Sequence, residues 1–573
     1  MGTFLPQLQE VEARRDMLNE FRGYNHNLRI QDSEFFDMKN MTGLFYPVLA
    51  PRAPRGRVRK LAKPNGLFAH NKLAWVDETG FYYDGKRIGT VADSPKQIVA
   101  MGAYIVIFPD KMYFNTETGE LKSLGARKTT SGTVRTTMCK VDGSDIAAAT
   151  GNTEPQNPTN GQYWIDTSTT PHTLRLYSSI TKTWNPVATT YAKIAAAGIG
   201  AGFSEYDGIT ISGMANADLN GEFTLHGAAN DYIIITALVE AVATQTAAVT
   251  VERTIPDMEF ITESENRLWG CNSDKHEIYA CKLGDPTNWK SFIGTSVDSY
   301  AVTVGTTGNF TGACTHLGYV LFFKEDVIHK IYGNRPSNYQ ITNVNARGVQ
   351  SGSDRSVVAV NETLFYKSKH DVCAYGAALP DSVSNALGQV GYHNAAAGAC
   401  GARYFISMAD ASGRYSLFVY DTNYGTWHKE DDVQVKHFAQ LGSDLYFINE
   451  ADGYLYSVNG NITDYADGNA RLEAGYDWYA ETGDIGMESP DQKYISKLTM
   501  RVEVDDKALV RIQVKYDRRG DWEEIYRLNV ASKRSFSVPF IPRRCDTMRL
   551  RFWGEGDFRL YSITKTTEQG SDV

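Results

Sequence analysis

The feature that most constrains the fold is a β unit that recurs seven times along the chain. Each copy opens on small or glycine-rich residues, continues as an apolar run, turns through polar residues and ends in a second run rich in aromatic side chains. The copies occupy residues 66–91, 97–124, 260–283, 314–333, 357–377, 399–431 and 437–460. They fill residues 65–130 and 257–462 at about 39 residues per unit, close to the ~40–45 residues of a four-stranded propeller blade.

A run of such units predicts an all-β protein built on a β-propeller of about seven blades. Radial closure removes exposed sheet edges, so short strands that are weak alone become stable together. The 33 Tyr, 25 Phe and 50 Gly residues agree with this, because aromatic side chains favour pleated surfaces and glycines serve tight turns. A count of six or eight blades stays open. The alternative architecture is a series of unrelated hairpins in sandwiches.

The remaining sequence divides into three segments. Residues 1–64 form an N-terminal arm, predicted as an extended docking segment with a short helix over Val11–Phe21. Residues 131–256 interrupt the repeats and predict an inserted small β domain. Residues 463–573 carry strict apolar–polar alternation, which indicates antiparallel strands with one wet face, so we predict a C-terminal antiparallel β-sandwich. The alternating apolar positions are Leu498, Met500, Val502, Val504, Val510, Ile512, Val514, Tyr516, Met548, Leu550 and Phe552.

The sequence offers no catalytic, cofactor-binding or metal-binding motif. It lacks HExxH, GxxxxGK[ST], GxSxG and the EF-hand loop. The stretch from Asp421 to Trp427 approaches the Asp-box turn of sialidase-type propellers but has the wrong spacing, so we interpret it as a β-turn with Trp427 packed between blades. We interpret His329 as a packing residue, and Asp431–Asp432 as part of a polar connection. We therefore expect no enzyme activity, cofactor or metal.

Seven single cysteines without a CxxC pair favour folding in a reducing cytoplasm over a disulfide framework. The first 21 residues lack the apolar core of a signal peptide, and no apolar run reaches the length of a membrane span. We expect a protein that is soluble when made.

One cluster of cations stands out from a formal net charge of −9 and a pI near 5.7. The six residues are Arg52, Arg55, Arg57, Arg59, Lys60 and Lys63. On extended chain they would contact a neighbouring subunit or DNA phosphates, or simply form a solvated linker. The negative net charge argues against tight wrapping of DNA, since proteins that wrap DNA tightly are basic over the binding surface.

Several strings resemble tail proteins of bacteriophages and prophages. They are NMTGLFYPVLAPRAPRG, SENRLWGCNSDKHEIYACKLGDPTNW, GYVLFFKEDVIHKIYGNRPSNYQ and YDTNYGTWHKED. The chain is most similar in architecture to the propeller-bearing tail hub, nozzle or packaged-DNA-stabilisation proteins of short-tailed phages. The resemblance implies a structural virion protein of the tail, assembled in the host cytoplasm, at the head–tail connection.

In such a family the subunit forms a homo-oligomeric ring, commonly a hexamer, below the portal and adaptor proteins. The ring extends the channel for double-stranded DNA and retains the genome until ejection. An acidic lumen would keep the duplex mobile by repulsion. No gate loop is identifiable in the sequence.

Two other functions stay open at this point. A tail-tip protein that binds a host-surface receptor or carbohydrate would use exposed aromatics such as Trp164 and Trp184, although core packing is the common use of such residues. A propeller glycan hydrolase is the third candidate, but no residue qualifies for a catalytic role.

Overall fold

The computed structural model describes residues 13–488, 492–529 and 532–569, and throughout these residues the protein is all-β. Helical structure in this part of the chain is confined to four 3-10 turns of three residues, at Ala217–Leu219, Pro336–Asn338, Asp354–Ser356 and Asn385–Leu387. The chain divides into two compact units, and each is described by itself. The first unit is Met1–Pro95, Phe323–Ile328 and Asn343–Val573, and the second is Lys96–Phe322 and His329–Thr342.

Seven sheets of the described residues match the seven predicted units, and the predicted all-β propeller fold is confirmed. The first three blades are β7 (Pro64–His70), β8 (Lys72–Asp77), β9 (Gly80–Tyr83) and β10 (Lys86–Thr90); β11 (Gln97–Met101), β12 (Tyr104–Phe108), β13 (Met112–Asn115) and β14 (Leu121–Ser123); and β27 (Phe260–Ser264), β28 (Arg267–Asn272), β29 (Glu277–Ala280) and β30 (Tyr300–Thr303). The next three are β31 (Gly312–His316), β32 (Tyr319–Phe323), β33 (Val327–Tyr332) and β34 (Gln340–Asn345); β35 (Val358–Val360), β36 (Thr363–Lys367), β37 (Val372–Tyr375) and β38 (Asp381–Ser382); and β39 (His393–Cys400), β40 (Arg403–Ala409), β41 (Tyr415–Asp421) and β42 (Thr426–Asp431).

Neighbouring blades meet through their first strands. In the first unit β7 packs beside the first strand of the last blade, β43 (Val435–Leu441), which packs beside β39, and β39 beside β35. In the second unit β11 packs beside β27, and β27 beside β31. The second strand of a blade is buried on both faces, as in β12 and β32. This double burial explains why these strands are continuous apolar runs in the sequence instead of alternating ones.

The last blade is completed by the N-terminal part of the chain. Its strands β43, β44 (Asp444–Asn449) and β45 (Tyr454–Ser457) are followed in the sheet by β6 (Gly56–Lys60), and β46 (Arg471–Leu472) lies outside β6. β6 runs antiparallel to β45, with Lys60 opposite Tyr454 and Gly56 opposite Ser457. Residues 56–60 therefore belong to the propeller and not to the predicted N-terminal arm.

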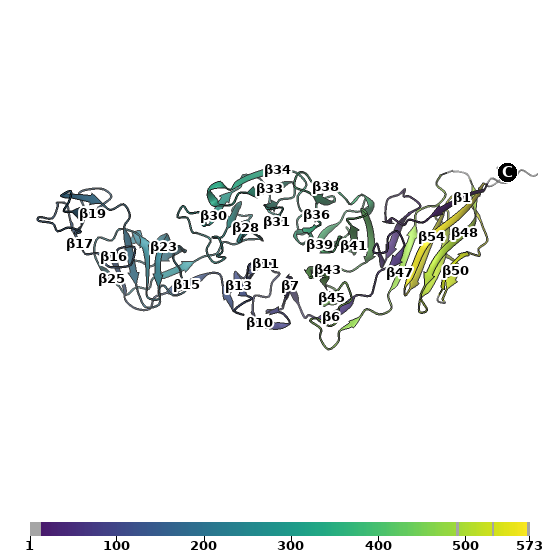
Figure 1. Cartoon of the computed structure of the whole chain (residues 1–573), viewed down its shortest axis with the longest axis horizontal. Helices are drawn as coiled ribbons and strands as arrows, with labels where there is room; N and C mark the ends of the chain where they lie inside the picture. The colour runs from purple at the N-terminus through teal and green to yellow at the C-terminus, as the bar shows by residue number, and fades with distance from the viewer. Residues whose placement is uncertain (1–12, 489–491, 530–531, 570–573) are drawn as a thin grey trace, which may run out of the picture. The chain divides into compact units, whose positions relative to one another are not determined.

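The C-terminal β-sandwich borrows strands from the N-terminus (Figure 1). One sheet has the order β1 (Ala13–Leu18), β54 (Phe558–Gln569), β48 (Lys493–Val504) and β51 (Ser532–Ser537), with β52 (Arg544–Cys545) also paired to β48. The other has the order β2 (Gly23–Tyr24), β3 (Glu34–Lys39), β47 (Asp477–Thr482), β53 (Met548–Glu555), β49 (Leu509–Tyr516) and β50 (Glu523–Leu528). The short strands β4 (Met41–Thr42) and β5 (Ala50–Pro51) pair with each other.

The sequence pattern predicted the sandwich core well and the arm less well. The alternating residues of β48, β49 and β53 are buried as expected, except that Tyr516 is only partly buried. The helix predicted over Val11–Phe21 is wrong, because Ala13–Leu18 is strand β1, paired antiparallel with β54. Backbone pairing with an available sheet edge outweighs the weak helical pattern of this segment.

The inserted domain has an eight-stranded and a four-stranded sheet. The larger sheet has the order β15 (Ala126–Thr129), β26 (Thr250–Arg253), β22 (Gly208–Ser212), β23 (Gly221–Ala229), β24 (Tyr232–Thr236), β21 (Tyr191–Ala195), β16 (Val134–Cys139) and β25 (Ala243–Gln245). The smaller has the order β17 (Ala148–Gly151), β18 (Tyr163–Asp166), β19 (Thr173–Ser178) and β20 (Thr183–Pro186). Since β15 pairs with β26, the domain begins a few residues before the predicted start at 131.

Candidate functional site

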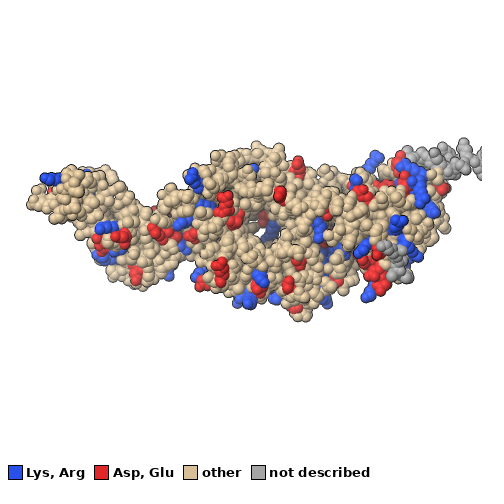
Figure 2. Space-filling model, in the orientation of Figure 1, with Lys and Arg blue, Asp and Glu red and all other residues tan. Residues whose placement is uncertain are grey.

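The six cations predicted as a contact segment lie between β5 and β7, and we call residues 52–63 the arginine segment. Arg52 and Arg55 are buried, Arg57 and Arg59 are partly buried, and Lys60 and Lys63 are exposed. The segment therefore does not present its charge as one basic surface. On the face in Figure 2, Lys and Arg side chains are interspersed with Asp and Glu.

Arg52 is held by acidic partners that come from distant parts of the chain. Its terminal nitrogens lie 2.6 and 3.1 Å from the two carboxylate oxygens of Glu473, in the two-pronged geometry that guanidinium favours. Its Nε donates to the side chain of Asn40 at 2.9 Å, and its guanidinium lies 4.3 Å from the ring centre of Tyr476. Burial by itself would raise the pKa of Glu473, but the hydrogen bond and charge of Arg52 outweigh it and lower that pKa below its ordinary value.

Arg55 is the most deeply buried member of the arginine segment, at 2% exposure. Its two terminal nitrogens donate to Glu430 at 2.5 Å and to Asp431 at 2.6 Å, both at the end of β42. Burial opposes charge on Asp431, yet Arg55 and Arg52 lower its pKa below the ordinary value. Asp431 thus belongs to a buried ionic cluster, and the prediction that it sits in a merely polar connection is wrong.

The other four cations lie along the last and first blades. The Arg57 guanidinium is 3.5 Å from the ring centre of Tyr454, and Arg59 donates from Nε to the carbonyl of Tyr465 at 2.9 Å. Lys60 contacts the carbonyl of Asp452 through Nζ, and Lys63 pairs with Asp93 at 2.7 Å. All six cations therefore have partners within the chain, and the buried Arg52 and Arg55 are not accessible to a duplex.

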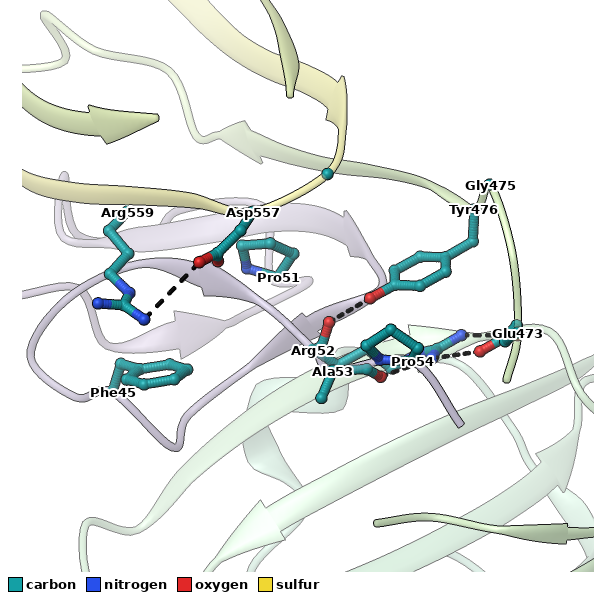
Figure 3. A pocket seen from close by; sticks show the side chains of 11 residues that line it. Phe45, Pro51, Arg52, Ala53, Pro54, Glu473, Gly475, Tyr476, Asp557 and Arg559 are labelled. Carbon is teal, nitrogen blue, oxygen red and sulfur yellow. Dashed lines mark hydrogen bonds and ion pairs between the residues drawn. The ribbon is translucent and has the colours of Figure 1, made fainter. Parts of the chain in front are cut away.

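A cavity of about 430 Å³ lies beside this cluster (Figure 3). Phe45, Arg52, Glu473, Tyr476 and Arg559 are among the residues that line it. Its carboxylates are already paired, Glu473 with Arg52, and Asp557 with Arg559 at 3.7 Å. Because the hydrogen bond and charge of Arg52 lower the pKa of Glu473, this carboxylate is a poor proton donor.

The cluster joins the propeller to the N-terminal part of the first unit. Strands β2, β3 and β4 pack against β42, whose residues are almost all buried although it is the outer strand of its blade. The approach is close, because a Cβ on Gly23 would lie 2.3 Å from the carbonyl oxygen of Trp427. Burial lowers the pKa of the neighbouring His428 to about 4, so this ring is neutral at pH 7.

Two interpretations of single residues are confirmed. Asp421 accepts the backbone N–H of Asn423 at 3.0 Å in a turn, and the Trp427 indole donates to the carbonyl of Val383 in the preceding blade at 2.7 Å. His329 is 1% exposed and lies 2.8 Å from the hydroxyl of Thr306, as a packed, hydrogen-bonded core residue.

The acidic half of the cluster was not predicted from the sequence. Its only signal in the sequence is the acidic run Glu430–Asp431–Asp432. Two further observations concern only the described residues: they contain no group of three or more His, Cys, Asp or Glu side chains placed to hold a metal ion, and none of their helices has the length and apolarity to cross a membrane.

Comparisons with known proteins find only remote structural similarity. No protein-family model matches the chain, and no curated protein matches its sequence. Among solved structures, BamB from Moraxella catarrhalis has a TM-score of 0.33 and 9% identity, over 71% of this chain and 97% of that one. Raptor from Chaetomium thermophilum has a TM-score of 0.29 and 9% identity over 70% of this chain, which spans only 29% of the Raptor chain. An endosialidase of phage phi92 has a TM-score of 0.20 and 10% identity, over 81% of this chain and 71% of that one.

Proposed function

We propose that the protein is a structural subunit of a bacteriophage tail, of the propeller-bearing hub, nozzle or packaged-DNA-stabilisation kind. It would form a homo-oligomeric ring at the head–tail connection and extend the DNA channel. The single observation that carries the proposal is the interlocking of the first unit, in which N-terminal strands complete both the last propeller blade and the C-terminal sandwich.

Interlocking suits a component that bears load. β6 closes the last blade, β1 and β3 pair with sandwich strands, and Arg52 and Arg55 tie this path to Asp431 and Glu430 at the end of β42. Pulling on the C-terminal sandwich would therefore load several backbone ladders together. A single linker between independent domains would resist such a force less well, because few contacts cross an ordinary domain boundary.

The electrostatics agree with a channel that DNA traverses without being held. The formal net charge is −9, and the cations of the arginine segment are paired within the chain. A channel wall with few free cations would displace few counterions from the DNA, so it would bind the DNA phosphates weakly. In this proposal the arginine segment has an internal structural role, and contact with DNA is transient and repulsive.

Oligomeric state and location together test the proposal. Mass photometry and negative-stain microscopy of the full chain, alone and with portal or adaptor proteins from the same genome, should show closed rings, and antibodies against the chain should label the tails of particles. A protein that stays monomeric with those partners and is absent from purified particles would contradict the proposal. Fluorescence anisotropy with a short duplex should show negligible binding near physiological salt, whereas tight binding that falls steeply with salt would contradict the repulsive channel.

A further inference from the structure

The small sheet of the inserted domain, β17–β20, has two faces of different character. Register places Ile165 opposite Leu174, and both side chains enter the hydrophobic core of the domain. On the other face Trp164 lies opposite Arg175, and Tyr177 lies opposite Trp184. Because side chains alternate along a strand, these four residues share the face that points away from the core.

We call Trp164, Tyr177 and Trp184 the aromatic face. The ring centres of Trp164 and Trp184 are 5.5 Å apart, and those of Tyr177 and Trp184 are 5.2 Å apart. Trp164 is 4% exposed and its indole donates to the carbonyl of Gly151 at 3.1 Å, whereas Tyr177 and Trp184 are only partly buried. None of the three belongs to the domain's hydrophobic core. Trp164 thus supports two rings that remain accessible on the outer side of the sheet.

A charged pair stands beside these rings. Asp166 is buried and accepts the Nε–H of Arg175 at 2.9 Å, and its other oxygen accepts from the hydroxyl and the backbone N–H of Ser168. The carboxylate thereby fixes the guanidinium in place. Within the described part of the chain, only Nε of Arg175 has a hydrogen-bond partner, so its terminal amino groups are oriented donors without acceptors.

We propose that the aromatic face binds a saccharide, with one sugar ring stacked on Trp184 beside Tyr177 and an oxygen of that sugar accepting from Arg175. The C–H face of a pyranose matches an aromatic ring, and its hydroxyl or carboxylate oxygens match fixed guanidinium donors. The size of the face favours a small ligand. A Trp or Tyr side chain presents about 150–250 Å² at most, so two partly buried rings fall well short of the ~800 Å² that a stable protein interface buries on each partner.

This proposal is independent of ring formation. Its test is binding of the labelled full chain to an array of neutral oligosaccharides and oligosaccharides containing uronic or sialic acid, followed by calorimetry with the best ligand. Trp184→Ala and Arg175→Gln should each weaken binding about tenfold or more, while Trp184→Phe, which keeps a ring, should lose less. Trp522→Ala is the matched control, since it removes a partly buried Trp from the C-terminal sandwich and should leave binding unchanged.

The acidic and neutral arms of the array identify the oxygen that Arg175 recognises. A larger loss for acidic sugars in Arg175→Gln indicates a carboxylate, and an equal loss indicates hydroxyls. Circular dichroism and melting curves check that each variant is folded. Absence of binding to every glycan, or equal loss in Trp522→Ala and Trp184→Ala, would overturn the proposal, whereas ring assembly should be the same in all variants.

Discussion

Replacing Arg55 by Met should destabilise the first unit strongly, although the change is conservative in volume. Arg55 is 2% exposed and neutralises Glu430 and Asp431, so the variant leaves two carboxylates in a buried site without their nearest cation. Removing one partner of a buried ion pair typically costs about 3–5 kcal/mol. For a unit of this size, we expect a fall in Tm of roughly 5 °C or more.

The expected loss should be local as well as global. Hydrogen exchange followed by mass spectrometry should show faster exchange in β42 and in the segment around Glu473, whose carboxylate accepts the backbone N–H of Arg55. Adding Glu430→Gln and Asp431→Asn to Arg55→Met should restore part of the stability, because the triple variant no longer buries unpaired charge.

Lys63→Ala is the control for this experiment. The Lys63–Asp93 pair has a similar distance of 2.7 Å, but the two side chains are 58% and 39% exposed, and such pairs contribute about 0–1 kcal/mol. If Arg55→Met lost no more stability than Lys63→Ala, or if the triple variant were less stable than Arg55→Met, the ionic cluster would not hold the junction as we infer.

Three other outcomes follow from the same junction. The pKa values of Asp431 and Glu473 are lowered in the folded state, so the two carboxylates stabilise the fold above about pH 4. This stabilisation is lost as pH falls through the folded-state pKa values. Melting curves recorded from pH 5 to pH 3 should therefore show a falling Tm. Burial lowers the pKa of His428 to about 4 in the folded state, whereas an unfolded His titrates near 6.5. As pH falls from about 6.5 toward 4, the unfolded state binds a proton that the folded state does not, so stability declines. A His428→Gln variant should show a flatter decline of Tm in that window. Gly23→Ala should lower the free energy of unfolding, measured in urea, clearly more than Gly85→Ala. Both glycines have positive φ (+84° and +76°), but only at Gly23 would the new Cβ lie 2.3 Å from a backbone atom, the carbonyl oxygen of Trp427. Equal losses would mean that the junction relaxes around the methyl group.

Local patterns predicted the elements that they encode. The apolar runs of the blades and the alternation in β48, β49 and β53 are direct consequences of burial on two faces or one, so the blade repeats and the sandwich core could be predicted from the sequence. The interpretation of Asp421 as a β-turn residue also rested on local chemistry, and the structure confirms it.

Long-range pairing could not be predicted in the same way. The strand Gly56–Lys60 has an ordinary sequence, and nothing in it specifies β45 as its partner. The positive charge of the arginine segment could be predicted from the sequence, but its partners could not. Arg52 and Arg55 pair with carboxylates more than 370 residues away in the chain. The run of cations in the sequence therefore makes contacts within the chain. Whether a charge is buried depends on the tertiary structure that supplies its partner, and the local sequence does not specify that partner.

The position of β6 has a consequence for how the chain is made. Lys60 and its contact at Asp452 are 392 residues apart, so at ~5–20 residues per second the ribosome needs roughly 20–80 s to supply the partner of a strand already synthesised. During that interval the nascent chain carries an unsatisfied strand, with its amide and carbonyl groups available to another polypeptide. Late completion of the last blade makes biosynthesis the stage at which this protein is most exposed to mispairing, and it gives nearby chaperones or sister chains a defined period in which to act.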